Sequence, residues 1–250
     1  PESPAAVLDP RYQADPPAAL DMVLSQARRQ MVTLVGFLGE ALSPGPRRPD
    51  LAFDAAVFTQ DMDRLIAYLA QIPLPEGNTR QLQRYGELMA LTDHLRRLGF
   101  RAGQGNRLTV ALYEPLLRRE ARHLGAVLRR IAHALPEAEP GDVIARKARD
   151  AALAALDQRL VRTLARLRRR EDRLRRRILS TKAAPPRLFA LTDALRWLRR
   201  TTTHAERMLA HLRAAEAQAE DRPPPVDEGP PVDIDEPTPA AALAQAKLTA

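Results

Sequence analysis

Apolar residues recur every three or four positions along most of the chain, which is the period of amphipathic helices. The clearest apolar stripe consists of Leu20, Val23, Leu24, Ala27, Met31, Leu34, Val35 and Leu38. Stretches rich in proline and glycine interrupt the pattern and divide it into separate helices. The pattern predicts six helices, which cover about residues 16–42, 54–71, 79–102, 109–135, 142–181 and 186–220.

Each predicted helix has a single apolar stripe and must bury it against neighbouring helices. Six such helices are accommodated most simply in two linked three-helix bundles, so the sequence predicts an all-α fold. We expect an extended entry segment over residues 1–15, a first bundle over 16–105 and a second over 106–220. Residues 221–250 are rich in proline and acidic residues, and we expect a disordered tail with a short terminal helix.

One helical phrase occurs twice, because the chain reads ALTDHLRRL from Ala90 and ALTDALRWL from Ala190. Seven of the nine positions match, and the two copies are 100 residues apart. Each copy lies on the third predicted helix of its set of three. The repeat therefore indicates an internal duplication of a three-helix unit.

The charge of the chain predicts an anionic partner. The net charge is +8 and comes almost entirely from arginine, while the part of the chain after residue 213 holds eight acidic and two basic residues. The preceding residues are therefore strongly basic. A body of this kind is attracted to nucleic acid, to phospholipid headgroups or to an acidic protein, and its own acidic tail is one such partner.

The densest charge lies in the fifth predicted helix, where residues 166–177 read RLRRREDRLRRR and include eight arginines. A solvated helix face and an electropositive binding strip are both compatible with this run. No aromatic residues alternate with the arginines, so a membrane surface is favoured over nucleic acid. The candidate anion-binding or partner-binding residues of this run are Arg168, Arg169, Arg170, Arg175, Arg176 and Arg177.

Several classes of protein are excluded or disfavoured. The chain has no cysteine, which excludes disulfides, thiolate metal sites and a cysteine nucleophile. Its longest apolar run, residues 31–38, is far shorter than a membrane span. No glycine-rich phosphate loop, Ser-His-Asp order or carboxylate dyad stands out, and His204 and His211, which share a helix face, have no carboxylate at metal-binding spacing. We therefore expect no enzyme activity, no metal and no cofactor.

The entry segment and the repeated phrase resemble a known family. The segment resembles the join between sodium/phosphate cotransporter-type membrane proteins and a C-terminal PhoU-like domain, through Leu8, Asp9, Pro10, Pro17, Ala18, Leu20, Ala27, Arg28 and Arg29. The plan of two three-helix bundles, each with a motif on its third helix, also resembles the PhoU family. The resemblance covers about residues 7–215 and implies a role in controlling phosphate transport.

The third-helix motif departs from the family pattern. In the family a Glu-Arg-Ile-Gly-Asp core places two carboxylates on one helix face, where they can hold metal ions. The matching positions here are Arg96 and Phe100 in the first copy. In the second copy they are Arg196 and Arg200, or Arg199 and Thr203 in another register.

A guanidinium group has no lone pair for a cation, so the family's metal sites are not expected here. Our hypothesis is that arginine charge replaces the metal, by pairing with Asp93 and Asp193 or by presenting cations to an anion such as phosphate. The candidate anion-binding or partner-binding residues of the two motif helices are Arg96, Arg97, Arg196, Arg199 and Arg200.

These observations together suggest a non-catalytic regulatory domain at the cytoplasmic face of the cell membrane, in a sodium/phosphate cotransporter-like protein. The expected partner is the transporter's membrane domain or an anionic membrane surface, with phosphate and a second copy of the chain as further candidates. Because the sequence begins with Pro1 rather than Met, we expect it to be part of a longer chain. The alternative is a stand-alone basic helical protein that binds nucleic acid or scaffolds a complex.

Overall fold

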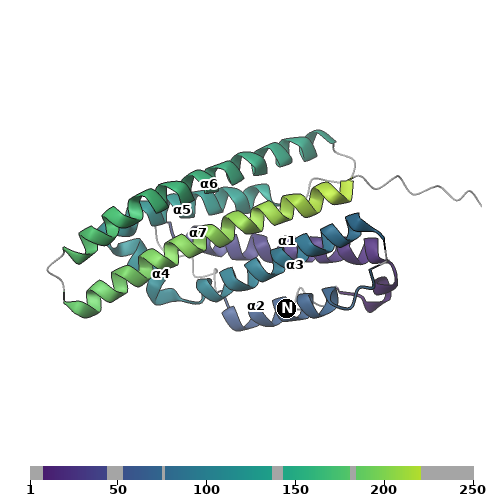
Figure 1. Ribbon diagram of the computed structural model, residues 1–250, viewed down its shortest axis with the longest axis horizontal. Coiled ribbons are helices and arrows are strands. Elements are labelled where there is room, and N and C mark those ends of the chain that lie inside the picture. Colours follow the sequence, from purple (N-terminus) through teal and green to yellow (C-terminus); the bar gives the residue numbers. More distant parts are fainter. Residues whose placement is uncertain (1–7, 44–52, 75–76, 137–142, 181–183, 221–250) are drawn as a thin grey trace, which may run out of the picture. The chain divides into compact units, whose positions relative to one another are not determined.

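The computed structural model describes residues 8–43, 53–74, 77–136, 143–180 and 184–220 (Figure 1). The predicted disordered tail, 221–250, and the first seven residues lie outside this part. Within it the secondary structure is helical and contains no strand, so the all-α prediction is confirmed. The α-helices are α1 (Pro16–Ala41), α2 (Ala55–Leu69), α3 (Thr79–Ala102), α4 (Gly105–Tyr113), α5 (Pro115–Ala134), α6 (Val143–Leu179) and α7 (Pro185–Glu220).

The first three α-helices begin where the sequence places polar caps. The side chains of Asp15, Asp54 and Asn78 accept hydrogen bonds from backbone amides in the first turns of α1, α2 and α3. Pro16 occupies the first position of α1, where the missing amide hydrogen costs nothing. Local capping chemistry therefore explains why these helix starts agree with the prediction to within about one residue.

The predicted fourth helix, 109–135, is wrong as a single element. The structure divides this region into α4 and α5, which meet at Glu114 and Pro115. Glu114 is extended, with φ −73° and ψ 124°, because a residue before proline is sterically excluded from the helical region. Pro115 then opens α5, so the described residues form seven α-helices where six were predicted.

The entry segment also differs from the prediction of an extended chain. Residues Pro10–Ala14 form a short 3₁₀ helix, η2. The carboxylate of Asp9 caps this turn by accepting from the backbone amide of Arg11 at 2.9 Å, and it pairs with the Arg11 guanidinium at 2.7 Å. The hydroxyl of Tyr68 donates to the Asp9 carbonyl at 3.1 Å and joins the entry segment to α2.

The α-helices share one continuous hydrophobic core, and the chain up to Glu220 forms one compact unit. Helices α1, α2 and α3 contact one another, and so do α5, α6 and α7. The two sets are joined by extensive packing of α1 on α5 and of α3 on α7. The division of the chain into two bundles near residue 105 stays a prediction, because the packing between the two sets of helices is as extensive as the packing within them.

Two glycines allow α1 and α5 to approach closely. A Cβ added to Gly125 would lie 2.8 Å from the Cβ of Leu42 and 3.0 Å from its carbonyl oxygen. A Cβ added to Gly39 would lie 2.8 Å from the backbone nitrogen of Arg129. Any larger residue at either position would force the two helices apart.

The repeated phrase lies on α3 and α7, which pack together. Its leucines are buried in both copies, namely Leu91, Leu95 and Leu98 in α3 and Leu191, Leu195 and Leu198 in α7. The indole Nε1 of Trp197 donates to the carbonyl of Arg101 at 3.0 Å across this contact. The leucines that the two copies share therefore form two similar packing surfaces, one on α3 and one on α7.

Candidate functional site

Helix α6 carries the arginine run, and its orientation is fixed by an apolar seam. The buried seam residues are Leu153, Leu156, Leu160, Leu164, Leu167 and Ile178, and α6 packs on α5 and α7. Glu171 interrupts the seam and is also buried, where it accepts from Arg199 of α7 at 3.0 Å and from Arg175 at 3.1 Å. The seam thus directs the remaining faces of the C-terminal half of α6 towards solvent.

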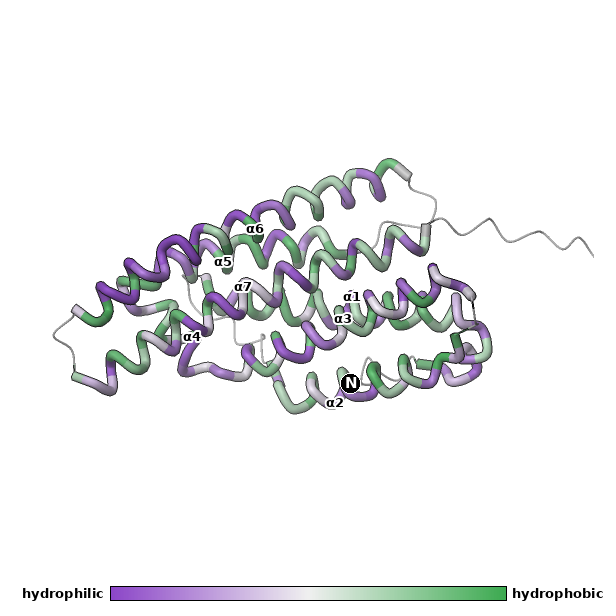
Figure 2. The backbone as a smooth tube through the Cα atoms, in the orientation of Figure 1, coloured by the Kyte–Doolittle hydropathy of each residue, from purple (hydrophilic) through white to green (hydrophobic). Residues whose placement is uncertain are grey.

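The face opposite the seam is a stripe of arginines. Its members follow one another at intervals of four, three, four and three residues, which keeps them on one side of a helix. We call Arg162, Arg166, Arg169, Arg173 and Arg176 the arginine face. In the N-terminal half of α6 small alanines replace these arginines, and Figure 2 shows the change as a strongly hydrophilic C-terminal half.

Within the arginine face only Arg166 contacts a carboxylate of a described residue. The buried carboxylate of Glu120, on α5, lies 3.4 Å from Nε of Arg166 and 2.7 Å from NH1 of Arg170. Arg169, Arg173 and Arg176 are exposed, and their side chains form no ion pair or hydrogen bond with any described residue. Three neighbouring positive charges on this face therefore have no counterion among the described residues.

The remaining predicted residues of the run have different surroundings. Arg168, Arg175 and Arg177 are exposed, and Arg168 lies within electrostatic range of Glu206 on α7. Burial raises the pKa of Glu206, and Arg168 partly opposes that rise. At the C-terminal end of α6 an open hollow is lined by Arg170, Arg173, Leu174, Arg176, Arg177 and Ser180.

The predicted arginines of the first motif helix, α3, are paired with acids. The Arg97 guanidinium lies 2.8 Å from the carboxylate of Asp93, one helical turn away. The Arg96 guanidinium lies 3.1 Å from Asp63 of α2. Phe100, at the other family carboxylate position, is exposed.

The arginines of the second motif helix, α7, follow the same rule with one exception. Arg196 lies 3.7 Å from Asp193, and Arg199 is directed to Glu171 of α6. The expectation that Asp93 and Asp193 pair with nearby arginines is therefore confirmed. Arg200 is exposed and lies close enough to Arg101 that its charge adds to burial in lowering the pKa of Arg101.

The structure does not bring all five motif arginines to one point. Arg96 is directed to an acid on α2 and Arg199 to an acid on α6. A phosphate ion at this place would have to compete with carboxylates that already hold most of these side chains. The C-terminal half of α6 therefore has more arginines without a carboxylate partner among the described residues, and phosphate binding by the motif arginines stays a prediction.

A group of histidines between α3 and α7 was not expected from the sequence. The Nδ1 atoms of His94 and His204 lie 3.3 Å apart, and the rings of His94 and His211 stack with centroids 5.4 Å apart. The Nδ1 of His211 lies 2.7 Å from a carboxylate oxygen of Glu87. The members on α3 are more than 100 positions from those on α7, so only the packing of α3 on α7 brings the two sets together.

Two members of the histidine group, His94 and His204, lie in surroundings that favour the neutral imidazole. Burial, followed by repulsion from Arg101, lowers the pKa of His204 to about 4. Burial, followed by repulsion from His211, also lowers the pKa of His94. Across the described ranges no group of three or more His, Cys, Asp or Glu residues is arranged to hold a metal ion.

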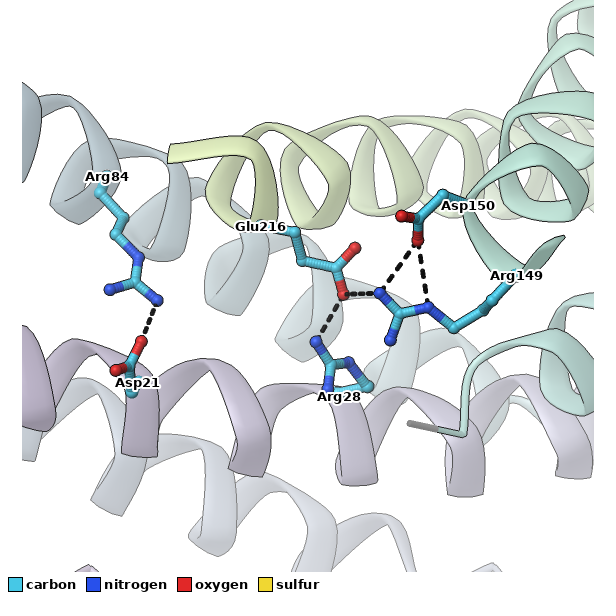
Figure 3. A network of polar contacts seen from close by, with 6 residues as sticks. All are labelled: Asp21, Arg28, Arg84, Arg149, Asp150 and Glu216. Carbon is cyan, nitrogen blue, oxygen red and sulfur yellow. Dashed lines mark hydrogen bonds and ion pairs between the residues drawn. The ribbon is translucent and has the colours of Figure 1, made fainter. Parts of the chain in front are cut away.

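Other arginines have a structural role and form a polar network between helices (Figure 3). Arg28 of α1 and Arg149 of α6 both contact one carboxylate oxygen of Glu216 on α7. Arg149 also pairs with Asp150 at 3.0 Å. Burial lowers the pKa of Arg28, and the nearby Glu216 opposes this effect.

A second pair in the same region joins Arg84 of α3 to Asp21 of α1. Like Arg28, Arg84 is buried at the level of its side chain. These arginines connect helices that are distant in sequence, and their charges are already matched by carboxylates. They are therefore not candidates for an external ligand.

No helix in the described part of the chain is both long enough and apolar enough to cross a bilayer. Comparisons with protein-family models, with curated proteins and with solved structures found no match to this chain.

Proposed function

We propose that this chain is a non-catalytic regulatory domain that docks on an anionic membrane surface through the arginine face of α6. The observation that carries the proposal is the row formed by Arg169, Arg173 and Arg176, which are exposed and have no carboxylate partner among the described residues. Each basic residue close to an anionic bilayer contributes about 1 kcal/mol of attraction. Three such residues on one helix face supply about 3 kcal/mol, or about a hundredfold in affinity.

The wider role follows from the resemblance to the PhoU family. On this proposal the chain is the cytoplasmic regulatory part of a sodium/phosphate cotransporter-like protein and controls phosphate transport. Two features support it: each set of three helices contacts internally, and the repeated phrase lies on α3 and α7. Helix α7 packs on both α6 and α3. A displacement of the docked α6 would therefore be passed to α7, which connects the second set of helices to α3 of the first set.

The direct test is co-sedimentation with lipid vesicles. The wild-type chain should bind vesicles that contain phosphatidylserine, should bind pure phosphatidylcholine weakly, and should dissociate as salt is raised. The triple variant R169Q/R173Q/R176Q should bind about a hundredfold more weakly. The matched control R29Q/R146Q/K147Q removes the same charge from exposed positions outside the arginine face and should lose much less affinity.

Two results would overturn the proposal. Equal losses in the two triple variants would mean that net charge, and not this face, determines binding. A wild-type chain that ignores phosphatidylserine but binds duplex DNA or RNA, with the same sensitivity to R169Q/R173Q/R176Q, would establish the nucleic-acid alternative.

A further inference from the structure

The hairpin of α6 and α7 ends in exposed apolar side chains. Leu179, the last residue of α6, is 64% exposed, and Phe189, in the second turn of α7, is 73% exposed. Pro185 and Pro186, which open α7, are also exposed. We call these four residues the hydrophobic tip. Figure 1 shows the C-terminal end of α6 and the N-terminal end of α7 side by side at one end of the helices.

The exposure of Phe189 is built into the packing of α7. Its neighbours Leu188 and Leu191 pack on the hydrophobic core, and Leu191 is almost completely buried. Phe189 lies on the opposite side of the helix and so cannot reach the core while these leucines are in place. A single exposed apolar residue is common on protein surfaces. Two such residues beside exposed prolines at one end of a hairpin are typical of an interaction site.

The charges around the tip identify the kind of partner. From residue 173 to residue 192 the sequence has no acidic residue. The exposed arginines next to the tip include Arg173, Arg175 and Arg176, of which only Arg175 pairs with a described carboxylate, that of Glu171. The open hollow at the C-terminal end of α6 lies immediately before Leu179 and presents guanidinium groups beside the Ser180 hydroxyl. A lipid surface has a layer of headgroup phosphates above a layer of acyl chains. The guanidinium groups suit the phosphate oxygens, and the hydrophobic tip suits the acyl chains.

We propose that the hydrophobic tip inserts into the interfacial layer of an anionic bilayer while Arg173 and Arg176 bind lipid headgroup phosphates. This inference rests on the docking function proposed above and adds the point of entry. Arginines hold the level of the headgroups, while Leu179 and Phe189 reach the acyl chains beneath them. Insertion adds a contribution to the binding free energy that salt does not screen, because the burial of apolar surface does not depend on ionic strength.

The first experiment places a reporter at the tip. The variant F189W should shift its emission to shorter wavelength on phosphatidylserine vesicles and should be quenched by brominated acyl chains. The baseline is the wild-type chain, whose only tryptophan, Trp197, is buried. The matched control Y12W carries an exposed reporter in η2, which packs on α1, and should not be quenched.

The outcomes separate insertion from docking. If F189W binds these vesicles without a shift or quenching, insertion is rejected and docking by charge stands. If no form of the chain binds the vesicles, both proposals are rejected.

A second experiment removes the apolar side chains. The variant L179S/F189S should lose about a hundredfold of the binding that remains at high salt, about tenfold for each side chain. The control V57S/L82S replaces two exposed apolar residues on α2 and α3 and should retain it. Circular dichroism shows whether each variant is folded, and equal losses in two folded double variants would refute insertion.

Discussion

Two groups of arginines in this molecule have the same chemistry and opposite surroundings. Arg28, Arg84 and Arg149 lie between helices, largely shielded from water, and each contacts a carboxylate from another part of the chain or a neighbouring residue. Arg169 and Arg173, on α6, are exposed and have no carboxylate partner among the described residues. The first group joins helices within the fold, and the second group is available to bind a partner.

The difference shows that arginine content alone does not define a binding site. A guanidinium keeps its charge under all ordinary conditions, so what varies is where the counter-charge comes from. For Arg28 and Arg149 it comes from Glu216, which α7 places beside α1 and α6. For Arg169, Arg173 and Arg176, on the exposed side of α6, no described residue supplies the counter-charge, so it must come from outside the described part of the chain.

The largest effect is expected from breaking the buried group. The variant E216A removes the carboxylate oxygen that Arg28 and Arg149 share. It should lower the free energy of unfolding by about 3 kcal/mol, because loss of one partner leaves a buried charge poorly compensated. Urea denaturation followed by circular dichroism measures this change. A loss below about 1 kcal/mol would show that the network is far better hydrated than its burial indicates.

A smaller effect is expected from the histidine group, where His204 and His94 resist gaining a positive charge as the pH falls. His204 has a pKa lowered from 6.5 to about 4 in the folded chain, so the unfolded chain binds more protons between these values. Stability should therefore be complete above about pH 6.5 and should fall as the pH is lowered towards 4. After allowance for partial exposure we expect about 1 kcal/mol from His204.

The charged and titratable groups that face His204 and His94 are Glu87, Asp93, Arg97, Arg101, Arg207 and His211. Most of the cationic groups among them oppose protonation of the imidazoles. The variant H204Q should flatten the stability profile between pH 6.5 and 4 when both proteins are denatured with urea at each pH. A profile as steep as that of the wild type would assign the acid sensitivity to carboxylates elsewhere.

The sequence was sufficient for the helices and for the apolar seam of α6, because both follow from local periodicity and capping. It failed at Pro115, where periodicity continues through a residue that interrupts the backbone. It identified the arginine run but did not separate Arg170, which pairs with Glu120, from Arg169, which has no carboxylate partner among the described residues. That distinction depends on Glu120, fifty residues earlier in the chain. The histidine group was unpredictable for the same reason, because α3 and α7 meet only in the folded chain.

The smallest effect on stability is expected where the effect on binding is largest. The variant R169Q/R173Q/R176Q should change the free energy of unfolding by less than about 0.5 kcal/mol, because these side chains have no partner among the described residues. At low salt the change should be a slight gain, since like charges one turn apart repel each other. The measurement is urea denaturation at low and high salt, with E216A as the reference for a costly change. A loss above about 1 kcal/mol would mean that the arginine face stabilises the fold and would remove the distinction between the two groups.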